Sequence, residues 1–290
     1  MGAIIPVLAW LIASGCSQWR WWQKPSDADS RRLLTRTDQQ SPMPFDPSRL
    51  HTTPDDIIAV GLSFDVDRFI VPTDRLDPER AATWKNVDEL RAGAAPTALW
   101  QRNGLRIGIV PESGRSNIGD ALSALDAKHE QLSRTMQSGH PLTLDLGPLP
   151  ASTTVFLFAA DGRLQGTTYD AGMLRRFQID YEVKLDQQTI RVDLFATPEL
   201  FRESDRPRYH SAGERIEFST VYDGATFHAL RAAVDVDPGD WLMIGSADSA
   251  ENRFTLGAAL MTEDTAGRAW ETVLLVGPRL YRSGSAEKSP

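Results

Sequence analysis

Residues 177–194, FQIDYEVKLDQQTIRVDL, decide the fold class. Apolar or aromatic residues alternate with polar ones in both halves of this stretch, and period-two alternation is typical of a β-strand with one buried face. The apolar positions are Phe177, Ile179, Tyr181, Val183 and Leu185, then Ile190, Val192 and Leu194. Residues 186–188 are suited to a turn between the halves. The stretch therefore predicts an antiparallel hairpin.

Similar short runs continue on both sides of this hairpin. Turn residues such as Asp161-Gly162, Asp223-Gly224 and Pro238-Gly239 separate them. We expect residues 140–282 to form a β-rich domain, an antiparallel sandwich or curled sheet. The pair Arg175-Arg176 is interpreted as a solvated segment, with an anion site as the alternative.

Residues 56–139 predict an α+β domain. Apolar residues at even positions of 58–70 indicate a long half-buried strand whose polar face carries Asp65 and Asp67. Asp77-Pro78 and Pro96 are suitable helix starts, and residues 105–110 read as a strand. From Ser116 an apolar stripe at helical spacing runs to Met136. The predicted fold class is α+β, with the β-rich domain following this unit.

Composition limits the possible functions. The 290 residues contain 31 Lys+Arg and 39 Asp+Glu, which gives a net charge of −8. An acidic chain without a basic stripe argues against nucleic-acid binding, because phosphate contacts need a basic surface. Hydrophobic residues make up 41% and charged residues 24%, which excludes a fully disordered chain, a collagen and a polytopic membrane protein.

The first sixteen residues, MGAIIPVLAWLIASGC, carry no charged side chain and end in Cys16, the single cysteine of the chain. The apolar run has the length of a signal-peptide core. Ala13, Ser14 and Gly15 precede Cys16 as small residues. This segment resembles a bacterial lipoprotein signal, in which a peptidase cuts before a cysteine that is acylated. An uncleaved anchor is the alternative.

The lipoprotein resemblance implies a membrane location. Residues 1–15 would be removed as a signal peptide, and residues 16–55 would be the acylated N-terminus and a flexible linker. Cys16 would hold the chain on a lipid bilayer of the cell envelope, and Ser17 favours the outer membrane over the inner. Trp19, Arg20, Trp21 and Trp22 are candidates for the headgroup layer or else ordinary linker. Residues 283–290 are expected to be a disordered tail.

Motifs for catalysis are missing from the sequence. We find no G-x-S-x-G, P-loop, dinucleotide fingerprint, H-E-x-x-H or C-x-x-C. No cofactor and no metal centre are therefore expected. Asp65 and Asp67 share one strand face and are candidates for a ligand or metal site, although a solvated strand face is the simpler interpretation. His129 is placed on the polar side of the predicted helix.

Two segments of the last third resemble the end of bacterial secretin channels. Residues 235–245, DVDPGDWLMIG, lead through a polar turn into a strand that ends in glycine, and residues 273–281, VLLVGPRLY, form an apolar-Pro-Arg-apolar closing strand. The glycine- and proline-rich segment of secretins is absent between them. The resemblance implies at most a relative or accessory of an envelope assembly.

Two functions follow from these observations. The first is a non-enzymatic binding or scaffolding component of an envelope assembly, in a secretion or pilus system, with an envelope protein as partner. The alternative is a periplasmic-side hydrolase or small-ligand-binding lipoprotein whose site is assembled from scattered residues such as Asp65, Asp67 and His228.

Overall fold

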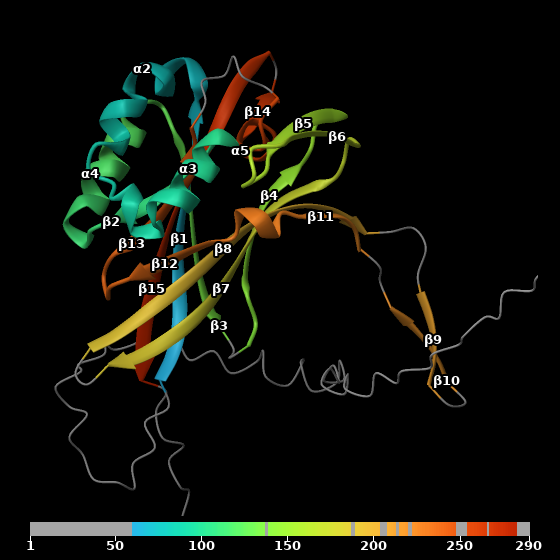
Figure 1. Ribbon diagram of the computed structural model, residues 1–290. Helices are drawn as coiled ribbons and strands as arrows, with labels where there is room; N and C mark the ends of the chain where they lie inside the picture. Colours follow the sequence, from blue (N-terminus) through green and yellow to red (C-terminus); the bar gives the residue numbers. More distant parts are fainter. Residues whose placement is uncertain are drawn as a thin grey trace, which may run out of the picture. The chain divides into compact units, whose positions relative to one another are not determined.

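The structure is a computed structural model that describes residues 60–282 except 137–138, 187–188, 204–207, 213–214, 220–221, 248–253 and 266. Antiparallel strands make up most of this part of the chain (Figure 1). The predicted α+β class with curled antiparallel sheets is confirmed. None of the helices in the described ranges is long and apolar enough to cross a membrane. Ala13, Ser14, Gly15, Cys16, Trp19, Arg20, Trp21 and Trp22 lie outside these ranges, so the lipid anchor stays a prediction.

The hairpin at residues 177–194 is confirmed. Strand β7 (Leu174–Asp186) pairs with β8 (Thr189–Glu203), from Leu174 opposite Phe201 to Asp186 opposite Thr189. Their sheet, called sheet B, has the order β11-β8-β7-β4, with β12 also beside β8. Its other strands are β4 (Leu142–Pro148), β11 (Tyr222–Thr226) and β12 (Ala232–Val236).

The second sheet, called sheet A, is built around the first and last described strands. Strand β1 (Val60–Pro72) pairs along its whole length with β15 (Arg268–Arg282). The strand order is β2-β13-β15-β1-β3, with β14 also beside β15. The remaining strands are β2 (Leu105–Val110), β3 (Lys128–Met136), β13 (Trp241–Ser246) and β14 (Thr262–Thr265). The two segments that resemble secretins lie on the neighbouring strands β13 and β15.

Sheet A takes strands from both sides of residue 139, where the sequence suggests a domain boundary. Strands β1, β2 and β3 precede that residue, and β13, β14 and β15 follow it. The two ranges therefore share one hydrogen-bonded sheet. Their division into two domains stays a prediction.

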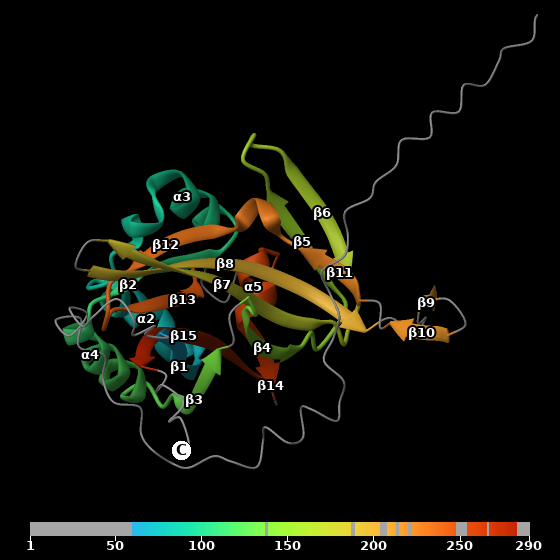
Figure 2. The same ribbon diagram turned by 90° about the horizontal axis from the view of Figure 1, so that it is seen from below.

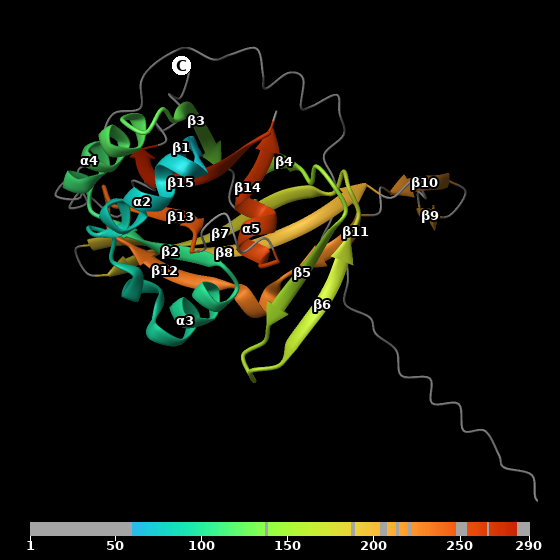
Figure 3. The ribbon, with the colours of Figure 1, turned by 90° about the horizontal axis from the view of Figure 1, so that it is seen from above.

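Both faces of sheet A are covered, one by helices and the other by sheet B (Figures 2 and 3). On one face, helices α2 (Thr73–Trp84) and α4 (Glu112–Ser123) pack Leu76, Ile118 and Leu122 against Phe69 of β1. The other face contributes side chains such as Phe64 to the core shared with sheet B. Burial of each such large side chain stabilises the fold by roughly 1.5–3 kcal/mol.

Shorter elements surround the two sheets. Their bounds are η2 (Glu89–Ala92), α3 (Ala94–Arg102), η3 (His228–Leu230), α5 (Leu256–Met261) and the strand pairs β5 (Thr153–Phe158) with β6 (Leu164–Tyr169) and β9 (Arg208–Ala212) with β10 (Arg215–Ser219). Trp100 of α3 joins the core, and its indole N–H donates to the carbonyl of Leu230 at 2.6 Å. Between β12 and β13, the expected Pro238-Gly239 turn is confirmed, with Gly239 at φ 93°.

The predicted helix from Ser116 to Met136 is wrong in its second half. Helix α4 ends at Ser123, and residues 128–136 form strand β3. Asp126 has a φ of 61°, which breaks the helical path. Strand β3 then pairs with β1 from Ile70 opposite Lys128 to Leu62 opposite Met136. Pairing with a distant strand overrides the local apolar spacing.

The start predicted for the first helix is also wrong. Helix α2 begins at Thr73, one turn before Asp77-Pro78, and Pro78 lies inside it. The Thr73 hydroxyl donates to the carbonyl of Ala269 on β15 at 3.2 Å. This contact fixes the extra turn against sheet A.

Two polar assignments need correction. The side chain of Arg175 is buried and donates to the carbonyls of Leu146 and Thr262 at 2.8 and 2.7 Å, so it is not in a solvated segment. The polar face of β1 is not open to water either: Asp65 is 7% exposed and Asp67 is 2% exposed.

Candidate functional site

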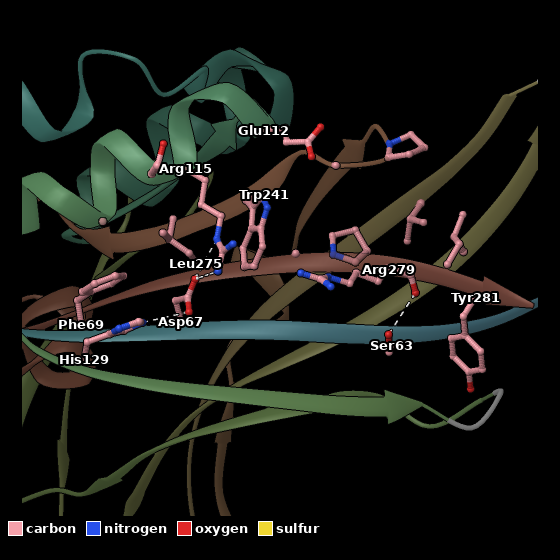
Figure 4. Close-up of a pocket in the computed structure, with 18 of the residues that line it drawn as sticks. Ser63, Asp67, Phe69, Glu112, Arg115, His129, Trp241, Leu275, Arg279 and Tyr281 are labelled. Carbon is pink, nitrogen blue, oxygen red and sulfur yellow. Dashed lines mark hydrogen bonds and ion pairs between the residues drawn. The ribbon is translucent and has the colours of Figure 1, made fainter. Parts of the chain in front are cut away.

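A cavity of about 860 Å³ lies between α4 and the polar face of β1 and β15. Helix α4 contributes Arg115, β1 contributes Asp67, and β13 contributes Trp241 (Figure 4). Tyr281 and Arg279 of β15 line it farther along the strand. Its volume falls within the usual range for ligand sites, which are mostly apolar with a few convergent polar groups.

The carboxylate of Asp67 is the centre of a polar cluster at one end of the cavity. Its Oδ2 accepts hydrogen bonds from Nε and Nη2 of Arg115 at 3.1 and 2.7 Å. Its Oδ1 lies 3.0 Å from Nε2 of His129. The Asp67 side chain is 3% exposed, so these contacts replace the water that burial removed. We call Asp67, Arg115 and His129 the Asp67 cluster.

Each partner of Asp67 lies on an aromatic ring. The guanidinium carbon of Arg115 is 4.0 Å from the centre of the Trp241 ring, a cation–π distance. The rings of His129 and Phe69 are stacked, with centroids 4.4 Å apart and planes 4° from parallel. Both rings limit the rotamers of the polar groups above them. The Asp67 cluster is therefore supported by ring contacts as well as by its own polar contacts.

Gly277 provides the space for Trp241. A Cβ at position 277 would lie 2.6–2.7 Å from three carbons of the indole, closer than van der Waals contact allows. The indole thus rests on the backbone of β15 and carries Arg115 on its other side. A side chain at 277 would displace both.

Strand register explains how the sequence builds this cluster. Asp67 and Phe69 are two residues apart on β1 and so point to the same face. The register places His129 of β3 directly opposite Phe69. Arg115 lies in the first turns of α4, which begins after Pro111. Three segments far apart in sequence therefore meet at Asp67.

The structure separates the two carboxylates that the sequence singled out. Asp67 lines the cavity and Asp65 does not. Asp65 instead accepts from Nε of Arg279 at 2.5 Å, and Arg279 is the group that reaches the cavity. In the described ranges, no three metal-ligating side chains are grouped to hold an ion.

His228, the third residue of the alternative site, is exposed on η3 and is not part of the cavity lining. The histidine beside Asp67 is His129, which the sequence placed on a helix face. Its strand carries too few apolar residues for alternation to reveal it. No sequence motif identifies Arg115 either, because its contacts are with Asp67 and Trp241, which are distant in sequence.

No family model matches the chain, and no curated protein matches it. One solved structure, the InvG secretin domain β-barrel from the Salmonella SPI-1 injectisome NC-base, aligns at 11% identity and a TM-score of 0.19. The alignment covers 79% of this chain and 65% of that chain, which is less than two thirds of its length. The neighbour is itself a secretin domain.

Proposed function

We propose that this protein is a non-enzymatic binding component of the bacterial cell envelope, held at a membrane through Cys16. The cavity under α4 receives a segment of its partner protein. The observation that carries this proposal is the Asp67 cluster. Asp67 contacts Arg115 and His129, and each of these two side chains also lies on an aromatic ring. A cavity wall whose polar groups already have partners needs little reordering when a ligand binds.

The other end of the cavity supplies the contact for the partner. The guanidinium of Arg279 has one carboxylate partner among the described residues, Asp65, and its side chain is 58% exposed. Its Nη1 and Nη2 are thus available to a carboxylate of the incoming segment, in the geometry that favours bidentate pairing. The ring of Tyr281 supplies aromatic contact area beside it.

Site-specific photo-crosslinking in intact cells tests this proposal. The photoreactive residue is placed at Ser116 or Ser123, which line the cavity, and at the exposed Leu164 of β6 as a control. We expect one reproducible crosslinked partner from the cavity positions and none from Leu164. Recovery of uncrosslinked chain alone would contradict the proposal.

A charge reversal then shows whether the crosslink depends on the cavity. Arg279→Glu should abolish it, because the arginine that receives the carboxylate becomes repulsive. Arg163→Glu is the matched control: Arg163 also pairs through Nε with an aspartate oxygen at 2.5 Å, but it lies outside the cavity lining. A crosslink that survives Arg279→Glu, in a chain that remains folded by circular dichroism, would rule out this mode of binding.

The anchor is tested separately. Metabolic labelling with a fatty acid should mark the wild-type chain and leave Cys16→Ala unlabelled. An unlabelled wild type would remove the membrane anchor from the proposal while leaving the cavity contact intact.

A small molecule in the same cavity is the second candidate. The observation that favours it is the volume of about 860 Å³, which a small ligand could fill. A thermal-shift screen of small organic acids distinguishes the two candidates. Stabilisation that Arg279→Glu removes, without any protein crosslink, would favour the small ligand.

A further inference from the structure

Strand β3 is an open edge of sheet A. It pairs with β1 on one side, and no strand pairs with its other side in the described part of the chain (Figure 4, in which β3 is the green strand beside the blue β1). Residues 128–135 are all exposed, and Leu132 exposes 41% of its surface. An exposed edge presents unpaired N–H and C=O groups that can accept another strand. The opposite edge of the sheet is different, because Asp88 forms a bridge with Ile109 of β2.

The sequence of β3 complements itself when it is reversed. The strand KHEQLSRTM has Leu132 at its centre. In an antiparallel pair centred there, Leu132 lies opposite its own copy and Gln131 lies opposite Ser133. Glu130 then lies opposite Arg134, and the two-fold symmetry makes this contact twice. Opposite charges and apolar pairs at directly facing positions stabilise antiparallel strands.

Neighbouring registers lack this complementarity. In a pair related by a two-fold axis perpendicular to the sheet, directly opposite residues point to the same face. The axis must therefore pass beside a residue, and the nearest alternative centres to Leu132 are Gln131 and Ser133. Centred on Gln131, the pair would place Lys128 opposite Arg134 twice, which is repulsive. Centred on Ser133, it would place Leu132 opposite Arg134 and Glu130 opposite Met136. Only the register centred on Leu132 pairs all nine residues without a like-charge contact.

The charged residues of this strand are available for the contact. Among the described residues, Arg134 forms no ion pair. Within the same described residues, Glu130 meets only the Nη1 of Arg68, at 3.5 Å, and its side chain is 61% exposed. Such a weak surface pair contributes little stability and is easily exchanged.

We propose that β3 binds β3 of a second copy of this chain, antiparallel and centred on Leu132, so that sheet A continues across a two-fold dimer. Such isologous interfaces use the same surface on both subunits. The contact is independent of the cavity and of the partner proposed above. It places His129, on the cavity face of the strand, opposite Thr135 of the second copy.

The first test is a charge-swap series on the full chain carrying Cys16→Ser, measured by sedimentation equilibrium over a range of concentrations. The parent should show a dimer, with twice the 32.1 kDa mass of one chain. Glu130→Arg or Arg134→Glu alone should weaken the dimer about tenfold or more, because each variant creates two like-charge contacts. The combined variant should restore it, since every Glu–Arg contact returns in reverse. A parent that stays monomeric up to its solubility limit would overturn the proposal.

The second test is cysteine crosslinking in the same background, which determines the register. Two copies of Leu132→Cys would lie directly opposite and should form a crosslinked dimer with a short thiol reagent. Two copies of Glu130→Cys would be about 14 Å apart, four residues along the strand, and should not. Leu164→Cys, on the exposed β6, is the control for random collision. Equal crosslinking at 130 and 132, or a dimer that ignores the charge swaps, would place the interface elsewhere and refute the pairing.

Discussion

Arg115 reaches from α4 across the cavity and places two guanidinium nitrogens on one oxygen of Asp67, at 2.7 and 3.1 Å. This contact connects a helix to a central strand of sheet A. It leaves the other carboxylate oxygen of Asp67 for His129. The stability of the cavity wall should therefore depend on the charge of Asp67.

Replacing Asp67 with asparagine tests that dependence. We expect a loss of about 2–4 kcal/mol in the free energy of unfolding, because the variant removes the charge that Arg115 and His129 face in a buried setting. Urea denaturation measures the change. Asp161→Asn is the control, because Asp161 also faces an arginine but its side chain is 49% exposed, and it should cost under about 0.5 kcal/mol. Equal losses of unfolding free energy in the two variants would show that the Asp67 cluster contributes no more to stability than an exposed ion pair does.

Two glycines of the cavity should respond to alanine in opposite ways. Gly277→Ala should destabilise the fold by about 1–3 kcal/mol, because the new methyl would clash with the Trp241 ring. Gly119→Ala, inside α4, should stabilise it by about 0.5–1 kcal/mol, since the nearest atom, Cζ of Phe69, is at an ordinary 3.7 Å. Thermal unfolding and near-ultraviolet circular dichroism measure both. If Gly277→Ala leaves the unfolding temperature and the near-ultraviolet spectrum unchanged, the Trp241 ring can move to make room for the methyl group.

A buried ion pair on the α2 side of sheet A should show non-additive mutations. Arg80 donates to both oxygens of Glu271 at 2.7 Å, and Glu271 is 1% exposed. Burial opposes the charge of Arg80, but the bonds to Glu271 and then Asp77 raise its pKa above the usual value. Glu271→Leu alone should cost about 3–5 kcal/mol, because the buried Arg80 loses its two-oxygen partner and keeps the more exposed Asp77. Adding Arg80→Met should recover much of that loss in the same denaturation assay. A double variant whose loss of unfolding free energy equals the sum of the two single losses would contradict the coupling.

Adjacent arginines on β7 should differ strongly in their tolerance of lysine. Arg175 donates to carbonyls at Leu146, Gly147, Leu260 and Thr262, and it also pairs with Glu263. A lysine has three donors at one point and cannot reach all of these acceptors. Arg175→Lys should therefore cost about 2–4 kcal/mol.

The neighbour provides the control for this prediction. Arg176 pairs with Asp145, and its side chain is 23% exposed. Arg176→Lys should cost under about 1 kcal/mol in the same unfolding experiment. Similar losses at 175 and 176 would argue against the special role of the buried guanidinium.

The sequence predicts those parts of the fold in which local pattern and final environment agree. The alternation at Phe177, Ile179 and Leu194 places the hairpin correctly because those side chains face one buried side. The nearly polar strand 128–136 escapes prediction, because its structure comes from hydrogen bonds to β1, whose paired residues lie 58–74 positions earlier in the chain. Apolar spacing around Leu132 imitates a helix there.

The candidate site was predicted only in part for a related reason. Asp67 could be recognised because it shares a strand face with Asp65. Arg115 and His129 could not, since their relation to Asp67 depends on the register of β3 and on the packing of α4. The burial of Arg175 was missed because a sequence shows the charge of a residue but not the carbonyls that surround it.

The pairing of β1 with β15 has a consequence for how the chain is made. Val60 lies opposite Arg282, so a central pair of sheet A joins the two ends of the described chain. A ribosome or an export channel releases residue 60 long before residue 282. Strand β1 therefore cannot pair with β15 until residues 268–282 have emerged, and contacts between such distant segments form slowly. During that interval the side of β1 that later pairs with β15 is an unpaired strand edge, the kind of surface that exposes a folding chain to aggregation.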